Sequence, residues 1–175
     1  MITTRGRTLI AEGGSEWKAK GVAVHGALHH EIYAMGTWPE TLGYEQLERR
    51  MGKEAADIWW DTLEANIFGE ADGAWLQAHG FNTIRVSFGW RRFTERTEDF
   101  HRILDICKRH NLKCIFDLHS APGGQNPDGH GDSMAMRGMF WEFENLQYRV
   151  VKAWGELADS LHHYGSELLG YEILN

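Results

Sequence analysis

The chain has 175 residues, 42% hydrophobic and 12% aromatic, a composition typical of globular domains and not of disordered, fibrous or membrane proteins. Lys and Arg number 18 against 25 Asp and Glu, and the formal net charge of -7 has the wrong sign for nucleic acid or anionic membrane partners. One ordinary domain fits this length, whereas a complete eight-stranded α/β barrel usually needs roughly 250 residues.

The N-terminal segment, residues 1–19, alternates weakly in hydropathy and carries a turn at residues 13–15, which predicts a small β-hairpin cap. Residues 20–175 then form the main domain. The segment lacks the apolar core of a signal peptide, and no later stretch reaches the ~18 apolar residues of a membrane span. A cytoplasmic location is the default expectation.

A short apolar strand is expected at residues 21–24, followed by an irregular loop, residues 25–43, rich in His, Gly and aromatic residues. Loops at strand ends often carry function. Next, a helix is predicted from residue 53, with Ala56, Trp59, Trp60, Leu63 and Ile67 along one apolar face.

The same alternation of helix and strand then repeats along the chain. A helix at residues 70–79 ends at Gly80 and precedes a strand at residues 81–90. A helix around residues 100–107, closed by Asn111, leads into the strand KCIFDL, and a helix at residues 146–161 leads into LLGYEIL. The two cysteines, Cys107 and Cys114, are expected to be buried free thiols.

Apolar strands that alternate with amphipathic helices indicate parallel strands joined by right-handed crossovers. The fold class is therefore α/β, either an open sheet or a closed barrel. Because no glycine-rich phosphate loop follows the first strand, we favour the closed barrel.

Polar residues interrupt the apolar strands near their C-terminal ends. Arg85 lies in TIRVS, Asp117 and His119 lie in FDLHS, and Asn175 ends YEILN. Each of these side chains alone could be a hydrogen-bonded polar group of the core. Together they favour a site, because α/β barrels build their active sites at this rim.

Ten histidines raise the possibility of a metal site, and His25, His29, His30, His119 and His130 could converge. The chain has no HExxH, no HxH in the first strand and no CxxC, so we expect neither a metal nor another cofactor. Trp90 follows a strand, where its ring could stack on a sugar or simply pack at the rim.

Three segments strongly resemble the strand-two, strand-three and strand-four regions of family 5 glycoside hydrolases: GEADGAWLQAHGFNTIRVSFGW, CKRHNLKCIFDLHSAPGGQN and YGSELLGYEILN. The loop DLHSAPGGQN is most similar to the β-1,3-glucan exo-hydrolase branch. The resemblance implies that the chain is the N-terminal half, strands one to four, of a (β/α)8 TIM barrel, in a family that hydrolyses β-linked glucans, β-1,3 or β-1,4, with retention of configuration.

The resemblance also implies roles for individual residues. Arg85 would support the nucleophile carboxylate, His119 would line the sugar subsite, and Asn175 would bind the sugar 2-hydroxyl. Trp90, Gln125 and Asn126 would contact ligand at the rim. The two catalytic glutamates of the family lie outside this chain, the acid/base being expected directly after Asn175, so we expect the 175 residues alone to be inactive and to need the missing C-terminal half of the barrel.

The sequence departs from the family after strand one, where GVAVHGALHHE stands in place of a Gly-Val-Asn-Leu-Gly-Gly-Trp type segment. His25, His29, His30 and Glu31 are expected to replace that wall of the pocket. Two alternatives remain at this point: a non-catalytic carbohydrate-binding or scaffold half barrel, and a metal-dependent barrel hydrolase that uses the histidines.

Overall fold

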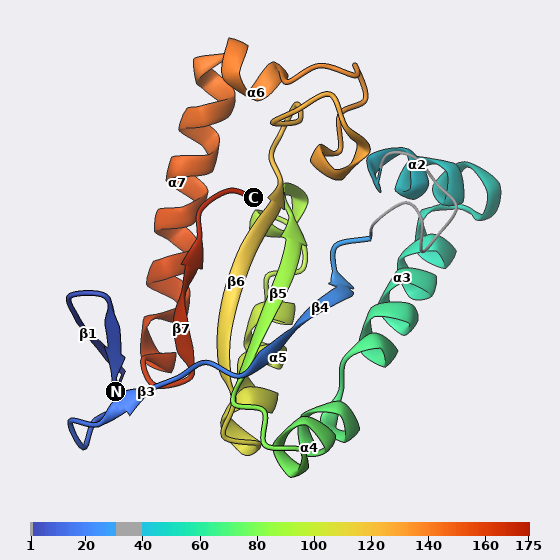
Figure 1. Ribbon diagram of the computed structural model, residues 1–175. Helices are drawn as coiled ribbons and strands as arrows, with labels where there is room; N and C mark the ends of the chain where they lie inside the picture. Colours follow the sequence, from blue (N-terminus) through green and yellow to red (C-terminus); the bar gives the residue numbers. More distant parts are fainter. Residues whose placement is uncertain (1, 31–39) are drawn as a thin grey trace.

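A computed structural model of the protein describes residues 2–30 and 40–175 (Figure 1). Its main element is a parallel sheet in the order β4-β5-β6-β7. The strands are β4 (Gly21–Leu28), β5 (Thr83–Gly89), β6 (Lys113–Ser120) and β7 (Leu168–Glu172). Sequential strands are therefore neighbours throughout, as in the first half of a (β/α)8 barrel.

Helices connect each strand to the next. Between β4 and β5 lie α2 (Glu40–Met51), α3 (Lys53–Ile67) and α4 (Glu70–Ala78). The 3-10 helix η1 (Trp90–Phe93) and α5 (Glu98–Arg109) follow β5, and η2 (Gly129–Gly131), α6 (Met139–Glu142), α7 (Glu144–Leu161) and η3 (His162–Tyr164) follow β6. The helices lie behind the sheet and on both sides of it, which leaves its other face open (Figure 1).

The N-terminal segment forms a small antiparallel sheet, β1 (Thr3–Arg5), β2 (Thr8–Ile10) and β3 (Glu16–Trp17). The predicted turn at residues 13–15 joins β2 to β3, which pair as the hairpin, and β1 adds a third strand that the sequence pattern did not predict. This small sheet lies toward the end of the molecule where the parallel strands begin (Figure 1). A domain boundary at residues 19 and 20 stays a prediction.

The core lies between the sheet and the helices. Side chains alternate between the two faces of a strand, and β5 directs Ile84, Val86 and Phe88 to the helical side, where all three are fully buried. Phe100 of α5 meets Phe88 and Phe116 edge to face, at ring-centroid distances of 5.0 and 4.9 Å. The opposite face of β5 and β6 is left to polar side chains.

Turn geometry follows the sequence prediction at two helix ends. Gly80 after α4 and Asn111 after α5 both adopt positive φ, 72° and 52°. Glycine and asparagine tolerate this conformation better than other residues. Cys107 and Cys114 are buried free thiols, as predicted, and burial raises the pKa of the Cys114 thiol well above its usual value.

Helix α2 was not predicted, because its few apolar residues are interrupted by Gly43 and gave no clear period. The predicted apolar face of α3 was also partly wrong. The buried residues of α3 are Ala56, Trp60 and Glu64, whereas Trp59 is 37% exposed. A carboxylate occupies the buried face because it has charged partners there.

Those partners form a buried ionic network around Glu64, which is fully buried. Its carboxylate accepts a hydrogen bond from the Arg92 guanidinium and lies 2.7 Å from His30 Nε2 and 3.0 Å from Arg96 Nη1. Asp99 at the start of α5 pairs with Arg92 at 3.1 Å. The network thereby joins the end of β4, α3, η1 and α5.

Within the described part of the chain, no helix combines the length and the apolar character that crossing a membrane requires.

We expect Glu64→Gln to lower the free energy of unfolding by about 3 kcal/mol or more, because it leaves buried guanidinium charge without its carboxylate. Urea denaturation measures the change. The control is Asp57→Asn, which removes an exposed pair with Lys53 on the same helix and should cost under about 1 kcal/mol. Equal effects of the two substitutions would contradict the stabilising role of the network.

Candidate active site

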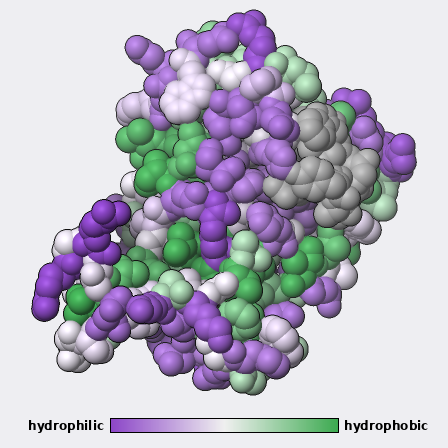
Figure 2. All heavy atoms as spheres, viewed as in Figure 1, coloured by the Kyte–Doolittle hydropathy of each residue, from purple (hydrophilic) through white to green (hydrophobic). Residues whose placement is uncertain are grey.

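Polar side chains gather on the open face of the sheet, near the C-terminal ends of its strands. Arg85 and Ser87 of β5, Asp117 of β6 and Glu172 of β7 lie on this face, and the register pairs Ser87 with Asp117 and Asp117 with Glu172. Hydrophilic side chains cross the middle of this face, with hydrophobic ones to either side (Figure 2). The strand ends therefore bring distant parts of the sequence into one cluster.

Arg85 is the centre of the cluster. Its Nε and Nη2 donate to the two carboxylate oxygens of Glu172 at 2.7 and 2.9 Å, a bidentate pair. Nη2 also lies 3.0 Å from Asp117 Oδ2 and 3.2 Å from Asn175 Oδ1. The side chain is 28% exposed, so Arg85 lies at the rim and its guanidinium is held among site residues.

Asp117 and His119 form a buried pair on β6. The His119 Nδ1 lies 2.6 Å from Asp117 Oδ2, and Asp117 is fully buried. An ionised carboxylate beside Arg85 can only accept hydrogen bonds, so Nδ1 of His119 carries the proton. The Nε2 atom of this tautomer is a hydrogen-bond acceptor.

Two histidines from the end of β4 complete one wall. The rings of His25 and His29 lie 5.5 and 5.0 Å from the ring of His119, and His25 Nδ1 is 3.0 Å from Ser87 Oγ. A break in the β4–β5 register at residues 24–28 re-aims the strand here. Gly26 allows this turn because glycine tolerates its φ of 84°. A Cβ atom at this position would also lie only 2.9 Å from Ile67 Cδ1.

His30 does not join this wall. It turns toward the helices, where it contacts Glu64 and its ring lies tilted against Trp60 at a centroid distance of 4.6 Å, so the expectation that it lines the pocket is not supported. The reason is that side chains alternate between the two sides of the chain after Gly26, so His29 and His30 point in opposite directions. Glu31 lies outside the described residues.

Gln125 and Asn126 are used within their own loop. The Gln125 amide donates to the His119 carbonyl oxygen at 2.8 Å and accepts from the Ala121 N–H at 3.0 Å. Asn126 Oδ1 accepts from the Asp128 N–H at 2.9 Å. Gln125 therefore positions the chain behind His119, and its predicted contact with a ligand stays a prediction.

The same loop is tied to α2 through Asp132. The carboxylate accepts hydrogen bonds from the N–H and the hydroxyl of Thr41 at 2.8 and 2.5 Å. The loop after β6 is thus tied to α2 beside the site.

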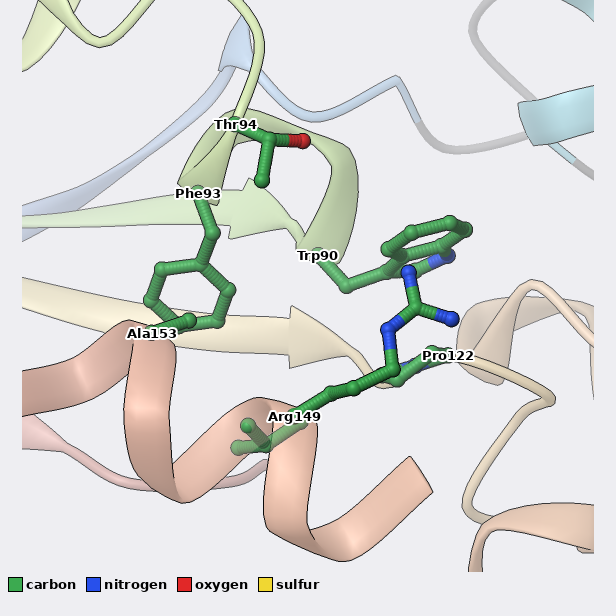
Figure 3. A pocket seen from close by; sticks show the side chains of 7 residues that line it. Trp90, Phe93, Thr94, Pro122, Arg149 and Ala153 are labelled. Carbon is green, nitrogen blue, oxygen red and sulfur yellow. The ribbon is translucent and has the colours of Figure 1, made fainter. Parts of the chain in front are cut away.

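Trp90 lies at the start of η1, after β5. It lines a shallow pocket together with Phe93, Thr94, Pro122, Arg149, Val150 and Ala153 (Figure 3). The Arg149 guanidinium from α7 lies 5.2 Å from the centroid of the Trp90 ring. Trp90 therefore contacts α7, and its stacking on a ligand stays a prediction.

Sequence reasoning treated Glu172 only as a strand residue, gave Ser87 no part in the site and named Asp117 among the polar strand residues without a role of its own. The signal was the strand period: residues two apart share a face, so Arg85 predicts Ser87 and His119 predicts Asp117. Glu172 needed the register between β6 and β7, which the sequence does not give.

The charge on Arg85 sets the electrostatics of the open face. Its hydrogen bonds, opposed by partial burial, lower the pKa of Glu172 below the usual 4.5. Glu172 therefore stays ionised and is unsuited to donate a proton. Among the residues that the structure describes, no three or more His, Cys, Asp or Glu side chains are arranged to hold a metal ion.

Comparisons with known proteins place this arrangement in context. Residues 52–175 match the profile described as cellulase (glycosyl hydrolase family 5). A β-xylosidase of Phanerodontia chrysosporium is 32% identical over 99% of this chain and 39% of its own length. A sporulation-specific glucan 1,3-β-glucosidase of Saccharomyces cerevisiae is 30% identical over 78% of this chain and 31% of its own length. The chain thus spans about a third of these relatives.

Among solved structures, the rutinosidase from Aspergillus niger superposes with a TM-score of 0.73 over 91% of this chain and 49% of its own, at 20% identity. The protein titled AoRut superposes with a TM-score of 0.70 at 16% identity. At these identities the likeness establishes the fold only, half of a (β/α)8 barrel.

The lowered pKa of Glu172 predicts a pH dependence of stability. Its pair with Arg85 stabilises the fold above about pH 4.5 and is lost as the pH falls through the lowered pKa. Urea midpoints from about pH 6 to about pH 3 should therefore fall more steeply for the wild type than for Glu172→Gln.

The control for this measurement is Glu48→Gln, on the exposed surface of α2, which should keep the wild-type pH slope. Parallel curves for the wild type and Glu172→Gln would mean that Arg85 does not stabilise the Glu172 carboxylate.

Proposed function

The chain belongs to glycosyl hydrolase family 5, and from this membership we propose that it carries the sugar-binding floor of a retaining β-glycoside hydrolase acting on β-linked glucans. The cluster around Arg85, at the C-terminal ends of β5, β6 and β7, carries the proposal. Barrel enzymes place their catalytic groups at this edge.

The floor offers one acceptor and one donor that suit a neutral sugar. With its proton on Nδ1, the His119 ring has a hydrogen-bond acceptor at Nε2, and the Asn175 side chain, which accepts from Arg85 through Oδ1, has a donor in its amide nitrogen. Hydrogen bonds to the sugar 2-hydroxyl strengthen as the oxocarbenium-like transition state forms. We assign this contact to Asn175.

Retaining hydrolysis needs two carboxyl groups about 5–5.5 Å apart, one an acid and then a base, the other a nucleophile. Asp117 and Glu172 do not suit these roles, because both are engaged by the same guanidinium. We assign them to holding Arg85 in place. The acid/base and the nucleophile then come from the rest of the barrel, where Arg85 would stabilise the nucleophile as an anion.

The substrate class follows from the relatives by analogy. The printed names of similar proteins are β-xylosidase and glucan 1,3-β-glucosidase, and the superposable structure is a rutinosidase. The names of the β-xylosidase and the glucan 1,3-β-glucosidase both indicate a β-linked glycoside as substrate. The wall of His25 and His29 replaces the usual family segment after strand one and would shape the sugar preference of this chain.

The test uses the protein extended to the length of its relatives, assayed on β-1,3- and β-1,4-linked glucan oligosaccharides and on an aryl β-xyloside. Arg85→Lys should lower kcat/KM by about 100-fold or more, because a point charge cannot hold Glu172 and Asp117 in the bidentate geometry.

A matched control is Arg109→Lys, which alters an exposed pair with Glu70 and should leave kcat/KM within about twofold. Lack of activity of the extended protein on every β-glycoside tried, or an unchanged rate for Arg85→Lys, would argue against the proposed function.

A further inference from the structure

A second pocket lies between α2, α3 and η1, and no described residue that lines it belongs to the Arg85 cluster. Helices α2 and α3 pack side by side on one flank of the sheet (Figure 1). This α2–α3 pocket has a volume of about 260 Å³, close to the lower end of the roughly 300–1,000 Å³ of small-molecule sites. Aromatic and charged side chains dominate its lining, among them Tyr44, Glu48, Lys53, Trp60, Arg91 and Glu95.

Two buried hydrogen-bond donors of the lining residues have no acceptor in the described part of the chain. They are the indole Nε1–H of Trp60 and the Nε–H of Arg91. Trp60 is 3% exposed, and its ring centroid lies 4.3 Å from that of Tyr44. A buried donor is costly to leave unsatisfied, and protein or ordered water usually supplies its acceptor. The pocket therefore suits a molecule that brings acceptor oxygens.

Aromatic rings, and no carboxylate, hold the Arg91 guanidinium. Its central carbon lies 5.7 Å from the centroid of the Tyr44 ring and 5.9 Å from that of Trp90. Within residues 2–30 and 40–175, no Asp or Glu forms an ion pair with Arg91. The next residue, Arg92, is by contrast engaged by Glu64. The charge of Arg91 is thus fixed beside the pocket without a counter-ion.

Acidic side chains complete the lining. Glu48 of α2 and Glu95 after η1 are exposed, and neither forms an ion pair with another described residue. Asp57 pairs with Lys53 at 2.9 Å. A small anion would meet these carboxylates, whereas a small cation would meet Arg91. The lining therefore favours a neutral molecule that both donates and accepts hydrogen bonds.

We propose that the α2–α3 pocket is a binding site for a neutral saccharide. A sugar hydroxyl both accepts and donates, so it can accept from Trp60 or Arg91 and donate to Glu48 or Glu95. The apolar face of the sugar suits the ring of Tyr44. The proposal asks no step of hydrolysis from this pocket, and it does not rest on the hydrolase activity proposed above.

Titration with two probes, cellobiose and its β-1,3-linked isomer, tests the proposal by binding alone. The protein extended to the length of its relatives carries isotope-labelled tryptophans, and the loss of one indole N–H signal in Trp60→Phe identifies the signal of Trp60. At least one disaccharide should shift this signal with a Kd of about 1–10 mM.

Arg91→Met should raise this Kd about fivefold or more, because it removes the guanidinium donors and keeps an unbranched side chain. The matched control is Arg149→Met, which removes the other guanidinium beside Trp90 from a position outside the pocket and should change the Kd by less than about twofold. Calorimetry compares the same two variants if Trp60→Phe does not fold.

Three outcomes would overturn the proposal. The first is an unchanged Trp60 signal at about 50 mM of either disaccharide. The second is an equal Kd for Arg91→Met and Arg149→Met. The third is binding of glucuronate about tenfold or more tighter than binding of glucose, which would make a carboxylate the occupant. An extended protein that binds the disaccharide but cleaves no glycoside would contradict only the proposed hydrolase function.

Discussion

The pairing of one guanidinium with two carboxylates organises the open face of the sheet. Arg85 of β5 contacts Asp117 of β6 and Glu172 of β7, so it joins three neighbouring strands at the level where they end. Asp117 is fully buried, and a buried carboxylate without a cation would cost several kcal/mol. Because Asp117 also orients His119, the position of the imidazole depends on the same charge.

A second ionic centre, around Glu64, performs a similar task on the helical side. His30, just after β4, binds Glu64 and is held against α3. His25 and His29, on either side of the turn at Gly26, lie toward the open face. One short segment of sequence is thereby divided between two environments. This division explains why only some histidines of the histidine-rich loop form a wall of the site.

The strands, the main helices and their parallel order could be predicted, because β5 and β6 are continuously apolar toward the helices and each amphipathic helix has a clear end. Arg85, His119 and Asn175 were proposed as site residues because polar residues at strand ends are unusual, and the structure brings Arg85 and Asn175 within hydrogen-bond distance. Glu172 was missed because its place depends on strand register, and composition could not reveal that nearby backbone uses the Gln125 amide. The predicted face of α3 was partly wrong because Glu64 can be buried only with arginines that come from a later segment.

The packing of Phe88, Phe100 and Phe116 has a consequence for how the chain acquires its structure. These rings come from β5, α5 and β6, which follow one another directly in sequence, so their contacts close only short loops. Local contacts of this kind form early and tend to open last. The centre of the sheet can therefore assemble during synthesis, before either edge strand has found its neighbour, and would exchange its amide hydrogens most slowly in the finished protein.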